Sequence, residues 1–273
     1  GPCDGPQAAQ TRVCRVPDTG GAQHAAPRAV GLRDEGFAVF APTEAGRRWA
    51  EAARGAAMEV SAQPGVRRQN LRHGQTWFVG VDALPNAADG AVGGVPLDGA
   101  WRSDVPDVPL HRAQLSIIYP GYPGRDVDES EPNHRYRRVR CAAHVDGLLP
   151  VGPDRRRFAQ EWHAYILGLP LNASRQAPTV VWPGSHRIMQ AALRDAMGDR
   201  DPRDVDVTDA YHAARNDVFQ RCDPVPLHAE MGGAFLLHRF ALHGTAPWEG
   251  PVAAGRMVAF FRPEFPTAAE WLA

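Results

Sequence analysis

The chain of 273 residues contains no lysine, because all thirty of its basic residues are arginine. This absence excludes enzymes that need a lysine amine to form a Schiff base or to hold pyridoxal phosphate. It also excludes Walker-type phosphate loops and protein kinases, both of which need a lysine at the nucleotide. Thirty basic and 31 acidic residues give a net charge of −1, which argues against a nucleic-acid binder driven by bulk charge.

Long apolar runs and cysteine pairs are also missing. No run approaches the roughly 18 residues that a membrane span needs, and the N-terminus lacks a signal-peptide pattern, so we expect no membrane partner. The four cysteines, Cys3, Cys14, Cys141 and Cys222, show no CxxC spacing. We therefore expect a reduced, cytoplasmic compartment. The use of arginine and alanine is typical of a GC-rich bacterial genome.

Short strands dominate the predicted secondary structure. Residues 1–29 are rich in Gly, Pro, Ala and Gln, so we expect a loose arm followed by one domain over 30–273. Runs of short apolar or alternating residues predict strands over 35–40, 76–81, 114–119, 139–145, 164–171, 179–182, 234–242 and 256–262. Helices are predicted over 44–60, 186–197 and 208–220. Strands without regular βαβ alternation predict a mainly β protein, an antiparallel sandwich or barrel.

The segment 121–140 carries acidic residues first and arginines afterwards. One interpretation is a solvated loop whose two halves pair with each other, and the other is a lid that presents arginines to an anionic substrate. We favour the first, because exposed charge runs are usually solvated.

Histidine and aspartate at two positions suggest a metal site. His144 and Asp146 are two residues apart at the end of a strand-like run, so their side chains point to one face. A second strand-like run reaches His243, and Arg256 follows thirteen residues later. Two histidines and a carboxylate form the facial triad of non-haem Fe(II) oxygenases.

At this point the chain resembles the phytanoyl-CoA dioxygenase family of Fe(II)/2-oxoglutarate-dependent oxygenases, which includes ectoine hydroxylase. The resemblance is carried by the His144-x-Asp146 pair, by Val181-Trp182-Pro183-Gly184-Ser185-His186, and by Leu242-His243-Gly244-Thr245 followed by Arg256. A weaker match runs over 114–121. The order of these motifs fits the family from residue 37 to the C-terminus.

The resemblance implies a double-stranded β-helix (jelly roll) with flanking N-terminal and inserted helices. It implies that His144, Asp146 and His243 bind iron and that Arg256 holds the distal carboxylate of 2-oxoglutarate, with a further bond from Thr245. Gln114 is expected to contact cosubstrate or substrate. The implied reaction is hydroxylation of a small molecule by O2, with release of succinate and CO2.

The chain departs from the family at one position that matters. Ectoine hydroxylase has a lysine in the segment equivalent to 114–121 that helps to bind 2-oxoglutarate, and this chain has none. Tyr119 or a nearby arginine would replace it, unless Arg256 and Thr245 suffice. Ectoine itself is not carried over as the substrate.

Three alternatives stay open. The two histidines could be core residues bonded to backbone. The same His/Asp/His set could hold zinc in a hydrolase, although Arg256 has no use there. The chain could also be a non-catalytic jelly-roll binding protein. We expect His186 to start a helix rather than bind metal, and His238 to lie on the opposite strand face from His243.

Seven arginines flank the His144-x-Asp146 motif and predict an anionic, carboxylate- or phosphate-bearing substrate. They are Arg135, Arg137, Arg138, Arg140, Arg155, Arg156 and Arg157.

Overall fold

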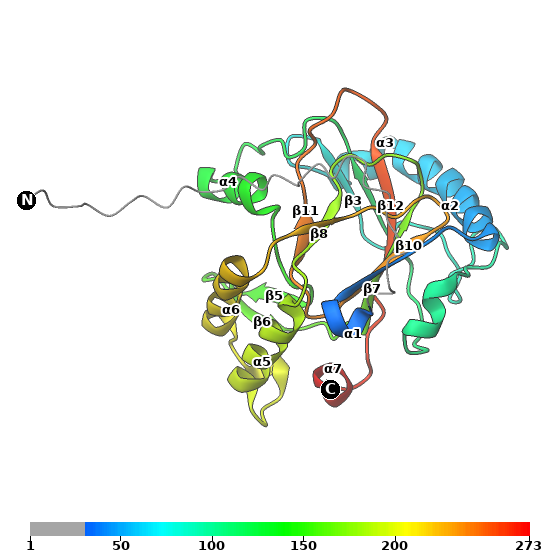
Figure 1. The fold of residues 1–273 in the computed structure, drawn as a ribbon. Coiled ribbons are helices and arrows are strands. Elements are labelled where there is room, and N and C mark those ends of the chain that lie inside the picture. Colours follow the sequence, from blue (N-terminus) through cyan, green and yellow to red (C-terminus); the bar gives the residue numbers. More distant parts are fainter. Residues whose placement is uncertain (1–30) are drawn as a thin grey trace, which may run out of the picture.

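Two facing antiparallel sheets form the centre of the protein (Figure 1), as seen in a computed structural model that describes residues 31–273. The arm predicted over 1–29 lies outside the described residues. The large sheet has the order β1 (Phe37–Phe40), β10 (Ala234–His238), β7 (Tyr165–Pro170), β12 (Arg256–Phe261), β4 (Gln114–Ile118), β3 (Trp77–Gly80) and β2 (Leu71–Arg72). The small sheet has the order β11 (His243–Thr245), β8 (Thr179–Val181) and β9 (Val225–Leu227). A separate hairpin joins β5 (Leu148–Val151) to β6 (Arg156–Ala159).

The chain passes repeatedly from one sheet to the other. After β4 in the large sheet, His144 extends the small sheet by a bridge to His243, and the chain then returns to β7. Strands β8 and β9 lie in the small sheet, β10 in the large, β11 in the small and β12 in the large. This alternation is the double-stranded β-helix, so the predicted fold class is confirmed.

Side chains alternate across β12 and divide the interior from the outer layer. Met257, Ala259 and Phe261 belong to the cluster on the outer face of the large sheet. Val258 belongs instead to the cluster between the sheets, with Val181 of β8. Arg256 shares the inward parity of Val258, so a charged side chain enters the barrel from this strand.

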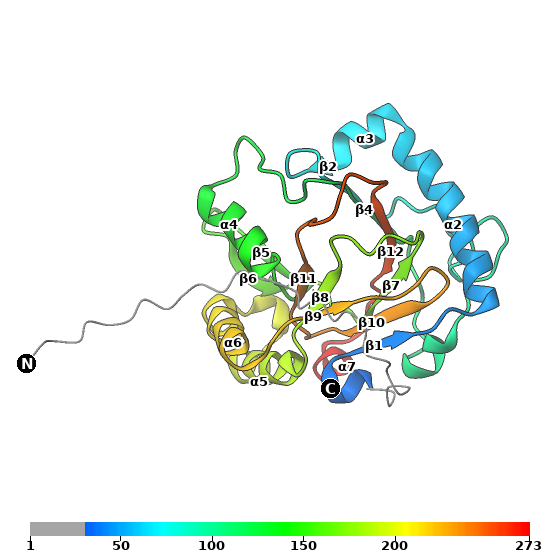
Figure 2. The same cartoon turned by 45° about the horizontal axis from the view of Figure 1, so that its top comes forward.

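Helices cover both outer faces (Figure 2). Helix α2 (Glu44–Ala62) packs Trp49, Ala53 and Ala57 against the large sheet. Thr43 caps its start, with Gly46 N 2.9 Å from Thr43 Oγ1. Helices α5 (Ser185–Met197) and α6 (Thr208–Arg221), inserted between β8 and β9, cover the small sheet. The remaining helices are α1 (Leu32–Glu35), α3 (Pro64–Asn70), α4 (Glu131–Arg140) and α7 (Ala268–Leu272), with short 3-10 turns at Ala100–Asp104 and Pro202–Asp204. None of the helices in 31–273 is long and apolar enough to cross a membrane.

Two predicted strands are wrong. Residues 139–145 begin inside α4, which Ser130 caps and which carries a proline in its first turn, and only His144 makes a strand-type bridge. Residues 234–242 are not one strand, because the chain turns after His238 and crosses to the other sheet, where His243 begins β11. The polar pair His238-Arg239 stands at this turn, but one such pair between two apolar stretches also fits a single continuous strand.

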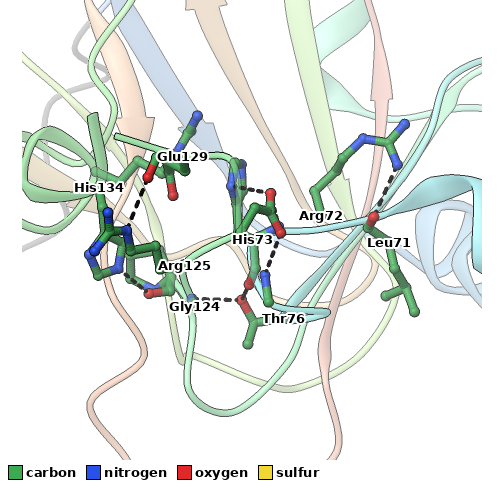
Figure 3. Close-up of polar contacts among 12 residues, drawn as sticks. Leu71, Arg72, His73, Thr76, Gly124, Arg125, Glu129 and His134 are labelled. Carbon is green, nitrogen blue, oxygen red and sulfur yellow. Dashed lines mark hydrogen bonds and ion pairs between the residues drawn. The ribbon is translucent and has the colours of Figure 1, made fainter. Parts of the chain in front are cut away.

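Charged groups within 121–140 pair with each other and with the β2–β3 turn (Figure 3). Arg125 lies 3.0 Å from Glu131, and Glu129 lies 2.6 Å from Arg137. The carboxylate of Asp126 accepts hydrogen bonds from the backbone N–H groups of His73 and Gly74 at 2.9 and 2.8 Å. The two charged halves of the segment 121–140 therefore pair with each other, as the first of the two interpretations expects. The bonds of Asp126 also fix the segment to the β2–β3 turn.

Candidate metal centre

Two histidines from adjacent strand positions lie side by side at one end of the small sheet. His144 and His243 exchange both backbone hydrogen bonds, at 2.9 and 3.1 Å, so their side chains project from the same face. Their ring centroids are 4.6 Å apart. Asp146 completes the group, and one ligand atom from each of the three residues lies within 4.8 Å of the others.

Each imidazole is oriented by a backbone carbonyl. Nδ1 of His144 lies 2.8 Å from the oxygen of Ala142, and Nδ1 of His243 lies 2.9 Å from the oxygen of Ala241. Because a carbonyl oxygen only accepts, Nδ1 carries the proton in both rings and Nε2 keeps its lone pair. Both Nε2 atoms face Asp146. That of His144 lies 3.0 Å from Asp146 Oδ1, and that of His243 lies 3.7 Å from Asp146 Oδ2. This tautomer and orientation are what a metal-binding histidine requires.

The protonation states also suit metal binding. Burial lowers the pKa of His243 to about 4, so this imidazole is neutral at physiological pH. Burial alone would raise the pKa of Asp146, but the positive charge of the Arg262 guanidinium holds it well below its usual range. His243 therefore presents a neutral imidazole, and Asp146 presents a carboxylate.

Arg262 is a residue of this site that the sequence reasoning missed. Its Nε lies 3.4 Å from Asp146 Oδ2, and its Nη2 donates to Gln114 Oε1 at 2.6 Å. The signal was available, since Arg262 is six residues after Arg256 and an even spacing places both on the inward face of one strand. Gln114, expected to contact a ligand, lies at the metal end of the barrel with this arginine as its partner.

Arg256 is a buried cation without an anionic partner. Arg256 is 7% exposed. Its one side-chain hydrogen bond among the described residues is donated by Nη2 to Thr179 Oγ1 at 3.1 Å. No carboxylate of residues 31–273 forms an ion pair with it. Burial accordingly lowers its pKa to about 10. Thr245 pairs with Thr179 across the small sheet, so both threonines stand on the inward face near this guanidinium.

Tyr119 does not fill the place of the family lysine. It follows β4 with outward parity, packs with the outer cluster, and accepts a hydrogen bond from Arg67 at 3.0 Å. This expectation is therefore wrong, because the alternation that points Gln114 into the barrel turns Tyr119 away from it.

Two further histidines lie outside the metal group. His186 is the second residue of α5, is buried, and bonds through Nε2 to the carbonyl of Arg33 at 3.0 Å. Its ring lies 4.9 Å from that of His238. The expected structural position of His186 at the start of a helix is confirmed, whereas His238 and His243 are separated by a change of sheet rather than by strand parity.

No protein-family model matches the sequence, and no curated protein matches it. Among solved structures, the chain is similar to the non-haem α-ketoglutarate-dependent carbocyclase SnoK from nogalamycin biosynthesis, with 14% identity, a TM-score of 0.49 and 90% of each chain covered. It is similar to EctD from S. alaskensis with 2-oxoglutarate and 5-hydroxyectoine, with 17% identity, a TM-score of 0.44, and 96% and 86% of the two chains covered. A third is the α-ketoglutarate-dependent epimerase SnoN from nogalamycin biosynthesis, with 12% identity, a TM-score of 0.48, and 89% and 86% covered.

Proposed function

We propose that the protein is a non-haem Fe(II)/2-oxoglutarate-dependent dioxygenase that hydroxylates a small organic substrate. The observation that carries the proposal is the combination of a His/Asp/His group with free Nε2 atoms and a buried arginine that lacks a counter-ion. Two imidazoles and one carboxylate are the ligand set of iron oxygenases that keep three positions open. Iron bound there, with 2-oxoglutarate and O2, supplies oxidation of an unactivated C–H bond with release of succinate and CO2.

The residues of the chain prepare the site for these groups. The carbonyls of Ala142 and Ala241 keep the protons on the far side of both rings, so Nε2 of each histidine can bind metal without a proton being lost. Arg262 holds Asp146 ionised and fixes one of its oxygens. The site is therefore charged and oriented before any metal arrives.

Arg256 would hold the distal carboxylate of 2-oxoglutarate. A planar guanidinium binds a carboxylate through two parallel hydrogen bonds. A buried guanidinium without an anionic partner bears an uncompensated desolvation cost, which binding of a carboxylate would offset. Thr179 fixes the orientation of this fork, and Thr245 would add a hydroxyl bond. A zinc hydrolase would make no use of such an anchor.

The test is anaerobic addition of Fe(II) and 2-oxoglutarate to the purified protein. A visible metal-to-ligand charge-transfer band, followed by one succinate per 2-oxoglutarate consumed on admission of O2, is the expected result. Asp146→Ala should abolish both signals, because it removes one of three ligands. If the protein bound Fe(II) but gave neither a band nor succinate, or if Asp146→Ala changed nothing, the proposal would be wrong.

A further inference from the structure

A groove of about 670 Å³ opens beside the candidate metal ligands. His144 and Asp146 line it at one side, and the side chain of His144 is 44% exposed. The other walls come from α4, the β5–β6 hairpin and α6, which lie side by side in both ribbon views (Figures 1 and 2). A molecule in this groove would touch the metal site directly.

The groove carries positive charge that the described chain does not neutralise. Arg155, Arg157 and Arg215 line it, and none of them forms an ion pair with a carboxylate of residues 31–273. Asp146 is the single acidic residue among those that line the groove, and it already faces Arg262 and two imidazoles. Three uncompensated guanidiniums therefore surround one cavity.

The structure separates these arginines from the others that flank the metal motif. Arg156 precedes Arg157 on β6, but it turns away from the groove to Asp206 and Asp209, at 2.6 and 3.3 Å. Arg137 lines the groove but pairs with Glu129 at 2.6 Å. Of the seven arginines in the sequence prediction, these two are thus already neutralised.

Two buried donors in the groove have no partner. The residue Tyr211 is 1% exposed, yet its hydroxyl makes no hydrogen bond within 31–273, and the same holds for Nε of Arg215. The guanidinium of Arg215 lies over the rings of Tyr136 and Tyr211, with centroid distances of 5.0 and 5.4 Å, and that of Arg157 lies 5.3 Å from the Tyr211 ring. Unsatisfied buried donors are costly and uncommon, so their concentration here indicates a missing acceptor.

The local field agrees with this geometry. The pKa of His212, which also lines the groove, is lowered by burial and then by the charges of Arg215 and Arg157. A neighbouring imidazole thus resists protonation, as expected in a region of positive potential.

We propose that this groove binds a phosphate group of the substrate through Arg157, Arg215 and the hydroxyl of Tyr211. A phosphate monoester carries a charge near −2 and three strong acceptor oxygens, which match several guanidiniums and a hydroxyl donor better than the single charge of a carboxylate does. The assignment of this phosphate to the substrate rests on the proposed oxygenase function. The binding site itself does not.

The site is tested by equilibrium dialysis of the full chain against radiolabelled inorganic phosphate, without metal or 2-oxoglutarate. Saturable binding at one site is expected. Tyr211→Phe removes only an unpaired hydroxyl, so it should fold normally and weaken binding several-fold, and Arg215→Gln should weaken it roughly tenfold or more. Arg156→Gln, on β6 beside Arg157 but turned toward Asp206 and Asp209, is the control and should leave phosphate binding unchanged. Circular dichroism and thermal melting of each variant verify that it is folded.

Three results would overturn the proposal. These are no saturable phosphate binding by the wild type, equal weakening by Arg156→Gln and Arg215→Gln, or displacement of phosphate by acetate at equal concentration, which would make the groove a general carboxylate site. Because the measurement uses neither iron nor 2-oxoglutarate, its outcome is independent of the charge-transfer and succinate assays. Phosphate binding without the charge-transfer band and succinate would disprove the oxygenase function and support the phosphate site. Both of those signals without phosphate binding would support the oxygenase function and disprove the phosphate site.

Discussion

Replacement of Arg256 by methionine should make the ligand-free protein more stable, which is unusual for a buried polar residue. Burial lowers the pKa of this guanidinium to about 10 from an ordinary value of 12.5. A difference of that size corresponds to a penalty of about 3 kcal/mol on the charged form. The sole compensating bond within 31–273 is the one to Thr179. We therefore expect Arg256→Met to raise the free energy of unfolding by about 1–3 kcal/mol.

Addition of cosubstrate should reverse this order. A ligand at a thousand times its dissociation constant stabilises the wild type by about 4.1 kcal/mol, which exceeds the advantage expected for Arg256→Met. Loss of one partner of a buried, hydrogen-bonded charge pair costs about 2–5 kcal/mol of binding, so 2-oxoglutarate should hardly stabilise Arg256→Met. The wild type would then be the less stable protein without 2-oxoglutarate and the more stable one with it.

The assay is urea unfolding under anaerobic conditions, with Fe(II), in the presence and absence of 2-oxoglutarate. Arg262→Met is the matched control, because Arg262 has Asp146 and Gln114 as partners and its removal should destabilise the protein. If Arg256→Met destabilised the ligand-free protein as much as Arg262→Met, Arg256 would not be an uncompensated charge. If 2-oxoglutarate stabilised Arg256→Met as strongly as the wild type, Arg256 would not be its anchor.

Three further outcomes follow from the same contacts. Arg262→Gln should lower the affinity for Fe(II) or Mn(II) about 10–100-fold in a metal titration, because Asp146 loses the group that orients it; an unchanged affinity would contradict that role. His238 should contribute a loss of about 1.4 kcal/mol of stability per pH unit as the pH falls from about 6.5 toward 3, since burial lowers its pKa to about 3 and only the unfolded chain then takes up its proton; the slope for His238→Phe across this range should be shallower than that of the wild type by about this amount, and an identical slope would refute the assignment. Gly244→Ala should weaken metal binding and lower the stability of the protein, because a Cβ there would lie 2.1 Å from the carbonyl oxygen of Cys141. Calorimetry that finds neither effect would show that the backbone at Cys141 can move away from residue 244 without cost.

Most of the fold could be predicted from the sequence, because strand parity and helix caps are local signals. The strands at β4, β7, β8 and β12, together with α5 and α6, are at or near their expected positions. Two apolar stretches were misassigned. In 139–145 a cap and an early proline outweighed β propensity. In 234–242 the polar pair His238-Arg239 marks the turn, but it also fits one continuous strand.

The candidate site could be predicted only in part. Spacing relates His144 to Asp146, the family resemblance adds His243, and the structure places ligand atoms of all three within 4.8 Å of one another. Contacts that depend on which strands are neighbours could not be predicted. Arg256 donates a hydrogen bond to Thr179 although 77 positions separate them in the sequence, and no local pattern connects the two residues.

The groove shows the same limit more strongly. Seven arginines near the metal motif predict an anionic substrate, but which of them face the cavity depends on helix α4 and on strand parity in the β5–β6 hairpin, neither of which was predicted. Arg215 and Tyr211 come from the distant helix α6, more than fifty residues beyond β6, and no local pattern joins them to Arg157.

The reciprocal backbone bonds between His144 and His243 have a symmetry that bears on the chemistry. An antiparallel pair of this kind has a local two-fold axis between its two residues, and here the rotation relates two imidazoles that each bond to the carbonyl two positions earlier. The two strands thus offer one Nε2 donor each, while the single carboxylate of Asp146 has no counterpart across the pair. The surroundings also differ, because the side chain of His144 is 44% exposed and that of His243 is 9% exposed, so a molecule from solvent would approach the site from the side of His144.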